Sequence, residues 1–175
     1  MKNLKLISII VFILFLTLSL NAQTTNPVTD DYKEAEIKGI TFKWQIVDEN
    51  INIILTAPTN GWIAVGFNPS KMMKDADILI GYVKNGEVFM EDHFGSGNIK
   101  HKADTDLGGT EDITIIGGSE LEEKTTLEFS IPLYSRDTND QRLEKGQEYK
   151  IIFAYGKKDD FKSYHKLRTS IMITL

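Results

Sequence analysis

Four aspartates have residue types and spacing that could do chemistry. Asp77 and Asp92 lie at the start and the end of two stretches that we expect to pair as strands, and Asp104 and Asp106 lie in the acidic loop that follows. Paired strands would bring these carboxylates to one sheet end, where hard oxygen ligands suit Ca²⁺. The sequence alone favours the alternative that they cap turns, because the loop lacks the spacing of an EF-hand.

Other chemical signatures are sparse. The spacing of His93 and His101 matches no zinc motif, and we expect His101 to be solvated. The chain contains no cysteine, which excludes thiolate metal sites, a cysteine nucleophile and iron–sulfur clusters. It also lacks serine-hydrolase, zinc-protease, Walker and dinucleotide-binding motifs. We therefore expect a ligand-binding protein and not an enzyme.

The elements that must position these residues have the period-two alternation of β-strands. The stretch Ile40–Val47 alternates apolar and polar residues, and Asn85-Gly86 is a strong hairpin signal. Turns rich in Gly, Asn, Asp and Pro separate the remaining stretches, so we predict an all-β antiparallel sandwich. Gly95–Gly109 is the longest expected loop. The expected strands are Ile40–Val47, Ile51–Leu55, Trp62–Phe67, Ile78–Val83, Val88–Phe94, Ile113–Ile116, Thr125–Ile131, Tyr149–Tyr155 and Ser170–Leu175.

The N-terminus has the order of a secretory signal peptide. Lys2 and Lys5 precede the apolar run Leu6–Leu20, and Ala22 provides a small residue at a cleavage point. A run of about 15 residues is short for a membrane span of about 20, although a retained anchor is the alternative. We therefore expect a signal peptide over residues 1–22, a flexible lead-in over 23–33 and one domain over 34–175. The mature protein would be secreted or periplasmic, with no stable membrane span.

The charge of the chain bears on its partners. The formal net charge is −5 at pH 7. Nucleic-acid binding needs clustered Lys and Arg, so we expect no nucleic-acid partner. An acidic surface favours encounter with a basic protein partner instead.

The order of residues from Gly61 onward is more specific than any single motif. Gly61-Trp62-Ile63-Ala64-Val65-Gly66-Phe67 leads to Met73 in a polar loop, and then to Ala76-Asp77-Ile78. This order resembles the DOMON family, over about Gly39 to Leu175. The downstream elements that agree are Ile80-Gly81-Tyr82-Val83, Asn85-Gly86, Glu91-Asp92-His93-Phe94, Gly108-Gly109 with Asp112-Ile113, Thr126-x-Glu128-Phe129, Asp137 with Asp140, Ile152-x-x-Ala154, and His165.

The resemblance implies an immunoglobulin-like β-sandwich that holds a ligand between its sheets. Haem-binding members of the family ligate iron through a loop methionine and through a residue just before the last strand, commonly histidine. The matching positions are Met73 and His165, whose thioether and imidazole are both ligands that iron accepts. The alternatives are that Met73 packs over the end of the sandwich, that Met72 is the ligand, or that His165 is a surface histidine.

Two functions follow from the resemblance. The first is an exported electron carrier, a cytochrome with haem b held by Met73 and His165, that meets a redox partner at the cell envelope. The second is a non-redox module that binds a carbohydrate or another small molecule. Stacking faces for such a ligand would come from Trp62, Tyr82, Phe94 and Tyr155.

Overall fold

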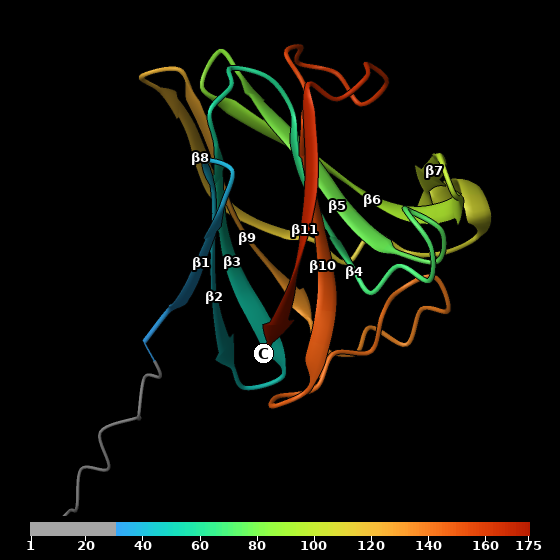
Figure 1. Cartoon of the computed structure of the whole chain (residues 1–175). Coiled ribbons are helices and arrows are strands. Elements are labelled where there is room, and N and C mark those ends of the chain that lie inside the picture. Colours follow the sequence, from blue (N-terminus) through green and yellow to red (C-terminus); the bar gives the residue numbers. More distant parts are fainter. Residues whose placement is uncertain (1–30) are drawn as a thin grey trace, which may run out of the picture.

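The computed structural model describes residues 31–175, and the expected signal peptide lies outside these residues. The described part forms two antiparallel sheets that pack face to face (Figure 1). The first sheet has five strands in the order β1-β2-β3-β9-β8. Their bounds are β1 Lys33–Ile37, β2 Ile40–Val47, β3 Asn50–Ala57, β9 Lys124–Pro132 and β8 Thr114–Leu121.

The second sheet has six strands in the order β11-β10-β4-β5-β6-β7. A short 3-10 helix, η1 (Asp104–Leu107), follows β7. The prediction of an antiparallel all-β sandwich is therefore confirmed. The bounds of the six strands are β4 Ile63–Phe67, β5 Asp77–Lys84, β6 Glu87–Gly97, β7 Lys100–Ala103, β10 Glu148–Tyr155 and β11 Leu167–Thr174.

A hydrophobic core fills the space between the two sheets. Alternation along β2 turns Ile40, Phe42 and Trp44 inward, and the rings of Phe42 and Trp44 stack with centroids 5.2 Å apart. Phe153 meets Phe42 from the opposite sheet at 5.4 Å. Each fully buried side chain of this size contributes roughly 1.5–3 kcal/mol, so this core provides much of the stability of the fold.

A second apolar cluster covers the outer face of the six-stranded sheet. All five residues of β4 are buried, so this strand is covered on both faces. Its odd-numbered residues Ile63 and Val65 belong to the core between the sheets, whereas Ala64 faces the other way. The outer cluster consists of Trp62, Ala64, Ala76, Ile78 and Ile80, with Met73, Tyr82, Ile152, Ala154 and Phe161 packed against it.

The sequence missed two strands, β1 and β7. Both are short edge strands in which no residue is buried: β1 turns only Ala35 and Ile37 toward the core, and β7 has Ala103 as its single apolar residue, so neither gives a clear apolar pattern. The expected loop Gly95–Gly109 in fact contains the end of β6, all of β7 and η1. The hairpin at Asn85-Gly86 is confirmed, and both residues have the positive φ of a type I′ turn. No helix within residues 31–175 is long and apolar enough to cross a membrane.

Candidate functional site

A cavity of about 950 Å³ lies on the outer face of the six-stranded sheet. Its floor is formed by β4, β5 and β10 through Ala64, Gly66, Ile78, Ile80 and Ile152. The sequence-based expectation that the ligand lies between the sheets is therefore wrong for this cavity, because the core already fills that space. The volume is at the upper end of the range for small-molecule sites, roughly 300–1,000 Å³.

Small residues keep the floor of the cavity flat. A Cβ on Gly66 would lie 2.8 Å from Cγ1 of Ile152 and 3.1 Å from Cγ1 of Ile78, so a side chain there would push both isoleucines apart. Ala64 and Ala154, which pair across β4 and β10, add only methyl groups to the same surface. The floor is thus apolar, and it suits a broad, flat ligand.

The loop between β4 and β5 forms one wall and carries Met73. The Asp75 amide donates to the Gly95 carbonyl and the Gly95 amide donates to the Ala76 carbonyl, both at 2.8 Å. The Met73 amide donates to the Asn98 carbonyl at 3.3 Å. Met73 is half-buried in the outer cluster, whereas Met72 has a positive φ and is 40% exposed. Both methionines line the cavity, and Met73 is held in place by its packing and its backbone hydrogen bond, whereas Met72 is exposed.

The loop between β10 and β11 forms the opposite wall and carries His165. Trp62 holds this loop, because its amide donates to the Lys158 carbonyl at 3.0 Å and its Nε1 donates to Oγ of Ser163 at 2.9 Å. The Asp160 carboxylate accepts from the amides of Lys162 and Ser163 within the loop. His165 is exposed at the rim and lines the same cavity as Met73. The structure thus brings together the two residues that the sequence paired.

A third residue with ligand chemistry, His101 of β7, also lines the cavity. Its Nδ1 lies 2.6 Å from Nδ1 of His93, and Nε2 of His93 lies 2.7 Å from a Glu91 carboxylate oxygen. If His93 donates from Nε2 to Glu91, its neutral ring accepts at Nδ1 from His101, which leaves Nε2 of His101 without a proton. Burial is the main cause that lowers the pKa of His101, and the neighbouring His93 lowers it further.

The expectation that His101 is solvated is therefore wrong. No sequence pattern pointed to its role, because β7, the short edge strand that presents it, lacks apolar alternation.

The cavity carries positive charge in a chain that is negative overall. Among the described residues that line it there is no aspartate or glutamate. An anionic ligand would therefore be favoured there. The cationic side chains that line it are Lys38, Lys100, Lys150, Lys162 and Arg168.

Of the four aromatic residues expected at a ligand pocket, Trp62 lines this cavity. Tyr82 belongs to the same face but packs on Phe89 and Phe161, with ring centroids 5.2 and 4.9 Å apart. Tyr155 pairs with Ile63 and is buried in the core between the sheets.

Phe94 pairs with Asp77, so both lie on the sheet face opposite the cavity. The assignments of Phe94 and Tyr155 to the pocket are therefore wrong, because strand alternation turns both side chains away from it. Phe161 and Tyr164, in the β10–β11 loop, line it instead.

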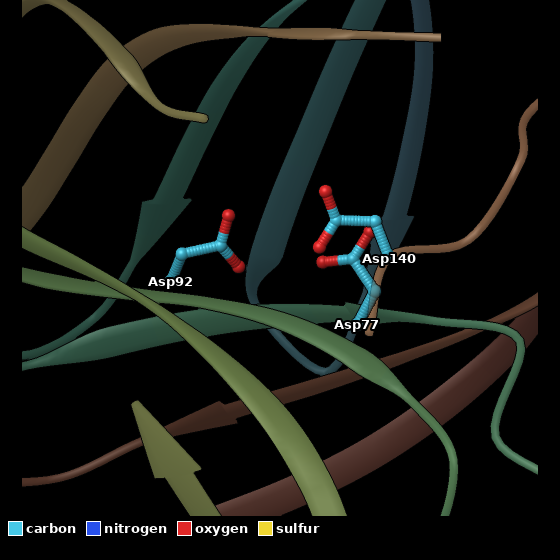
Figure 2. Close-up of side chains that lie close together, drawn as sticks. All are labelled: Asp77, Asp92 and Asp140. Carbon is cyan, nitrogen blue, oxygen red and sulfur yellow. The ribbon is translucent and has the colours of Figure 1, made fainter. Parts of the chain in front are cut away.

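An acidic cluster lies on that opposite face, at the end of β5 and β6. Figure 2 shows the carboxylates of Asp77, Asp92 and Asp140 pointing toward one another, and one oxygen of each lies within 4.8 Å of the other two. Asp104, Asp137 and Asp140 form a second, overlapping group by the same measure. The predicted convergence of Asp77 and Asp92 is confirmed. Asp106 is exposed and belongs to neither group, so its inclusion was wrong.

Burial and mutual repulsion perturb these carboxyl groups. Burial is the main cause that raises the pKa of Asp92 to about 9, and the charge of Asp77 is the second. Burial is the main cause that raises the pKa of Asp104 to about 7, and the nearby charge of Asp140 adds to it. The same two causes, in the same order, raise the pKa of Asp77 well above its usual range. Burial is also the largest cause that raises the pKa of Asp140 to about 6. Such shifts are common where charged groups are gathered for a function.

A family model for the DOMON domain matches residues 36–156. The DBH-like monooxygenase protein 1 of Mus musculus is 30% identical over 127 residues, which are 71% of this chain and 20% of that protein. The MOXD1 homolog 2 of Drosophila melanogaster is 25% identical over 116 residues, 66% of this chain and 15% of that protein. The chain thus spans a fifth or less of the length of these two relatives.

Two solved structures have a similar fold. The cytochrome b domain of pyranose dehydrogenase from Coprinopsis cinerea has a TM-score of 0.64 at 11% identity, over 81% of this chain and 80% of that one. The cytochrome domain of Myriococcum thermophilum cellobiose dehydrogenase has a TM-score of 0.59 at 11% identity, over 82% of this chain and 81% of that one. At these identities the likeness concerns the fold.

Proposed function

The chain belongs to the DOMON family, and from that premise we propose that its outer cavity binds haem b and that the protein is an exported one-electron carrier. One observation carries the proposal: a thioether, Met73, and an imidazole, His165, come from two separate loops to line one cavity. Both donor types suit haem iron. Bound haem would supply the redox-active iron, and the protein would supply its binding and environment.

The rest of the cavity fits the same ligand. The flat apolar floor of Ala64, Gly66 and Ala154 suits the face of a macrocycle. Haem b also carries two propionate carboxylates, for which Lys150, Arg168 and the other cations of the lining are suitable partners. Trp62 would act as a positioning residue, because it holds the loop that carries His165.

The relatives support this reading at the level of the domain. The cytochrome b domain of one dehydrogenase and the cytochrome domain of another have this fold. The similarity to the DBH-like monooxygenase protein 1 is confined to a fifth of that protein, so we do not transfer a monooxygenase activity to this chain. We propose instead that the chain itself is not an enzyme, and that it exchanges electrons with a partner protein at the cell envelope.

The alternative, a neutral carbohydrate as ligand, has less support. The exposed ring of Tyr164 lies at the cavity and would suit a sugar face. A neutral sugar, however, gives no partner to the five cationic side chains of the lining. An anionic ligand is therefore the better match.

The proposal is tested by reconstituting the purified chain with haemin and recording its absorption spectrum. We expect a shifted Soret band and six-coordinate iron. Met73→Ala should open a coordination position and lower the reduction potential, since a thioether ligand raises it. His165→Ala should weaken haem retention more than Met73→Ala does. Met72→Ala is the matched control and should leave the spectrum unchanged.

Three results would contradict parts of this account. A chain that produces no Soret shift with haemin refutes haem binding and favours the small-molecule alternative. A spectrum that survives both Met73→Ala and His165→Ala refutes the ligand assignment. If His101→Ala removes haem and His165→Ala does not, the imidazole ligand is His101, whose Nδ1 is the nitrogen that contacts His93.

A further inference from the structure

The acidic cluster on the opposite face of the six-stranded sheet has the composition of a cation site. Asp77 begins β5, Asp92 lies on β6, and Asp140 comes from the long loop between β9 and β10. The two strands of one hairpin and a distant loop thus bring one carboxylate oxygen each to within 4.8 Å of the others (Figure 2). Asp104, at the start of η1, and Asp137 extend the cluster through Asp140. Every candidate ligand in these two groups is a carboxylate oxygen.

Several of these oxygens are buried without a hydrogen-bond partner. Asp77, Asp92 and Asp104 are 3%, 4% and 1% exposed. Within residues 31–175, Oδ1 of Asp77, Oδ1 of Asp92 and both carboxylate oxygens of Asp104 have no hydrogen-bond partner. The other oxygen of Asp77 accepts a long hydrogen bond from the Gln141 amide, at 3.3 Å. Buried polar atoms are nearly always satisfied, so such a concentration of unpartnered oxygens indicates a missing ligand.

The cluster also lacks positive charge. In the part of the chain that the structure describes, no Lys or Arg side chain forms a salt bridge with any of these five aspartates. Burying a carboxylate without a counter-charge is strongly unfavourable, and gathering several raises the cost further. A bound divalent cation would provide the missing charge and would satisfy the free oxygens at once.

We propose that Asp77, Asp92 and Asp140, with Asp104 beside them, bind Ca²⁺. The donor set consists of hard oxygens, which favour Ca²⁺ or Mg²⁺ over zinc or copper. Oxygens that bind one ion at a Ca–O distance of about 2.4 Å lie at most about 4.8 Å apart, and the oxygens of this group meet that limit. Mg²⁺ requires about 2.0–2.1 Å and near-octahedral geometry, and it keeps several waters, so a buried cluster of carboxylates from three segments suits Ca²⁺ better.

The surrounding backbone is built closely around the cluster. A Cβ on Gly109 would lie 2.5 Å from Oδ2 of Asp137 and 3.2 Å from Cβ of Asp104, so the chain passes directly against the carboxylates. Asp77 also follows Ala76, whose amide donates to the Met73 carbonyl at 3.1 Å. Bound Ca²⁺ would therefore brace the loop that carries Met73, from the side of the sheet opposite the cavity.

Calorimetric titration and thermal unfolding of the chelator-treated, haem-free chain test the site independently of haem. We expect saturable heat with CaCl₂, and a rise in Tm of roughly 5–10 °C at calcium about a hundredfold above its Kd. Asp92→Asn should abolish both effects. Without calcium this variant should unfold no earlier than the wild type, because it replaces a buried carboxyl group that has an unpartnered oxygen with a neutral amide of the same shape. An unchanged Tm in chelator therefore shows that the variant folds.

The matched control is Asp106→Asn, which removes an exposed aspartate outside the cluster and should leave calcium binding unchanged. The proposal is overturned if neither heat nor a Tm shift appears up to about 10 mM calcium, above the Kd range of even weak extracellular sites. It is also overturned if MgCl₂ binds as tightly as CaCl₂, or if Asp92→Asn retains calcium binding. Because no haem is present, these outcomes leave the haem proposal untouched.

Discussion

The close approach between Gly95 and the Met73 loop makes Gly95→Ala an informative substitution. A Cβ at residue 95 would lie 1.7 Å from the Met73 carbonyl oxygen and 2.7 Å from its carbon. Real Cβ atoms essentially never approach within 3.0 Å of another heavy atom, so the carbonyl oxygen must move by at least about 1.3 Å. That movement also strains the two 2.8 Å hydrogen bonds that join residue 95 to Asp75 and Ala76.

Overpacking costs about 1–3 kcal/mol and a weakened hydrogen bond about 1 kcal/mol, so we expect a loss of about 2–4 kcal/mol in unfolding free energy. For a domain of this size that corresponds to a fall in Tm of roughly 6–12 °C. The displaced loop should also lose Met73 as a ligand, and the haem-loaded variant should show a lower reduction potential.

Calorimetry and a redox titration measure the two effects. Gly97→Ala is the matched control on the same strand, because the nearest heavy atom to its Cβ would be Cβ of Lys100 at 3.9 Å. It should retain the wild-type Tm and potential. If Gly95→Ala retains both as well, the argument that Gly95 positions the Met73 loop is refuted.

Trp62→Phe removes the hydrogen bond to Ser163, so amide exchange in the β10–β11 loop should accelerate, while Tm falls by only a few degrees, for a loss of about 1 kcal/mol; unchanged exchange would contradict the positioning role. Arg168→Glu should weaken haem binding measurably, whereas the same change at Lys84, a residue outside the cavity, should not. Equal effects of the two substitutions would contradict recognition of an anion at the rim of the cavity. In the presence of a chelator, the urea midpoint of unfolding should fall as pH rises from about 4 to 9. The pKa values of Asp92 and Asp104 are raised in the folded state, so it binds more protons than the unfolded state in this range. An equally steep fall in the Asp92→Asn variant would contradict the assignment of a raised pKa to Asp92.

The sandwich could be predicted because local pattern encodes it. The continuous apolar run at Trp62–Phe67 indicated a buried strand, and β4 is indeed covered on both faces. The edge strands β1 and β7 could not be found in this way, because they are only five and four residues long and contain no buried residue. His101 was misjudged for the same reason, since its place on β7 brings it to the cavity.

The candidate sites depend on contacts that no local pattern encodes. Pairing of β5 with β6 brought Asp77 and Asp92 together as expected, because adjacent strands linked by a tight hairpin fix their own register. Asp140 comes from a loop whose path depends on the whole fold, so the resemblance included it but no local pattern placed it beside Asp77. Ile152 and Ala154, apolar on the outward side of β10, were the available signal that the second face of this sheet is covered.

A haemin titration followed at the Soret band decides whether the outer cavity is a haem site. We expect saturation at one haem per chain for the wild type. Ala154→Trp, which fills the cavity floor from β10, should abolish that saturation without unfolding the sandwich, as circular dichroism would verify. Failure of the wild type to saturate, or equal saturation by the folded Ala154→Trp variant, would contradict the claim.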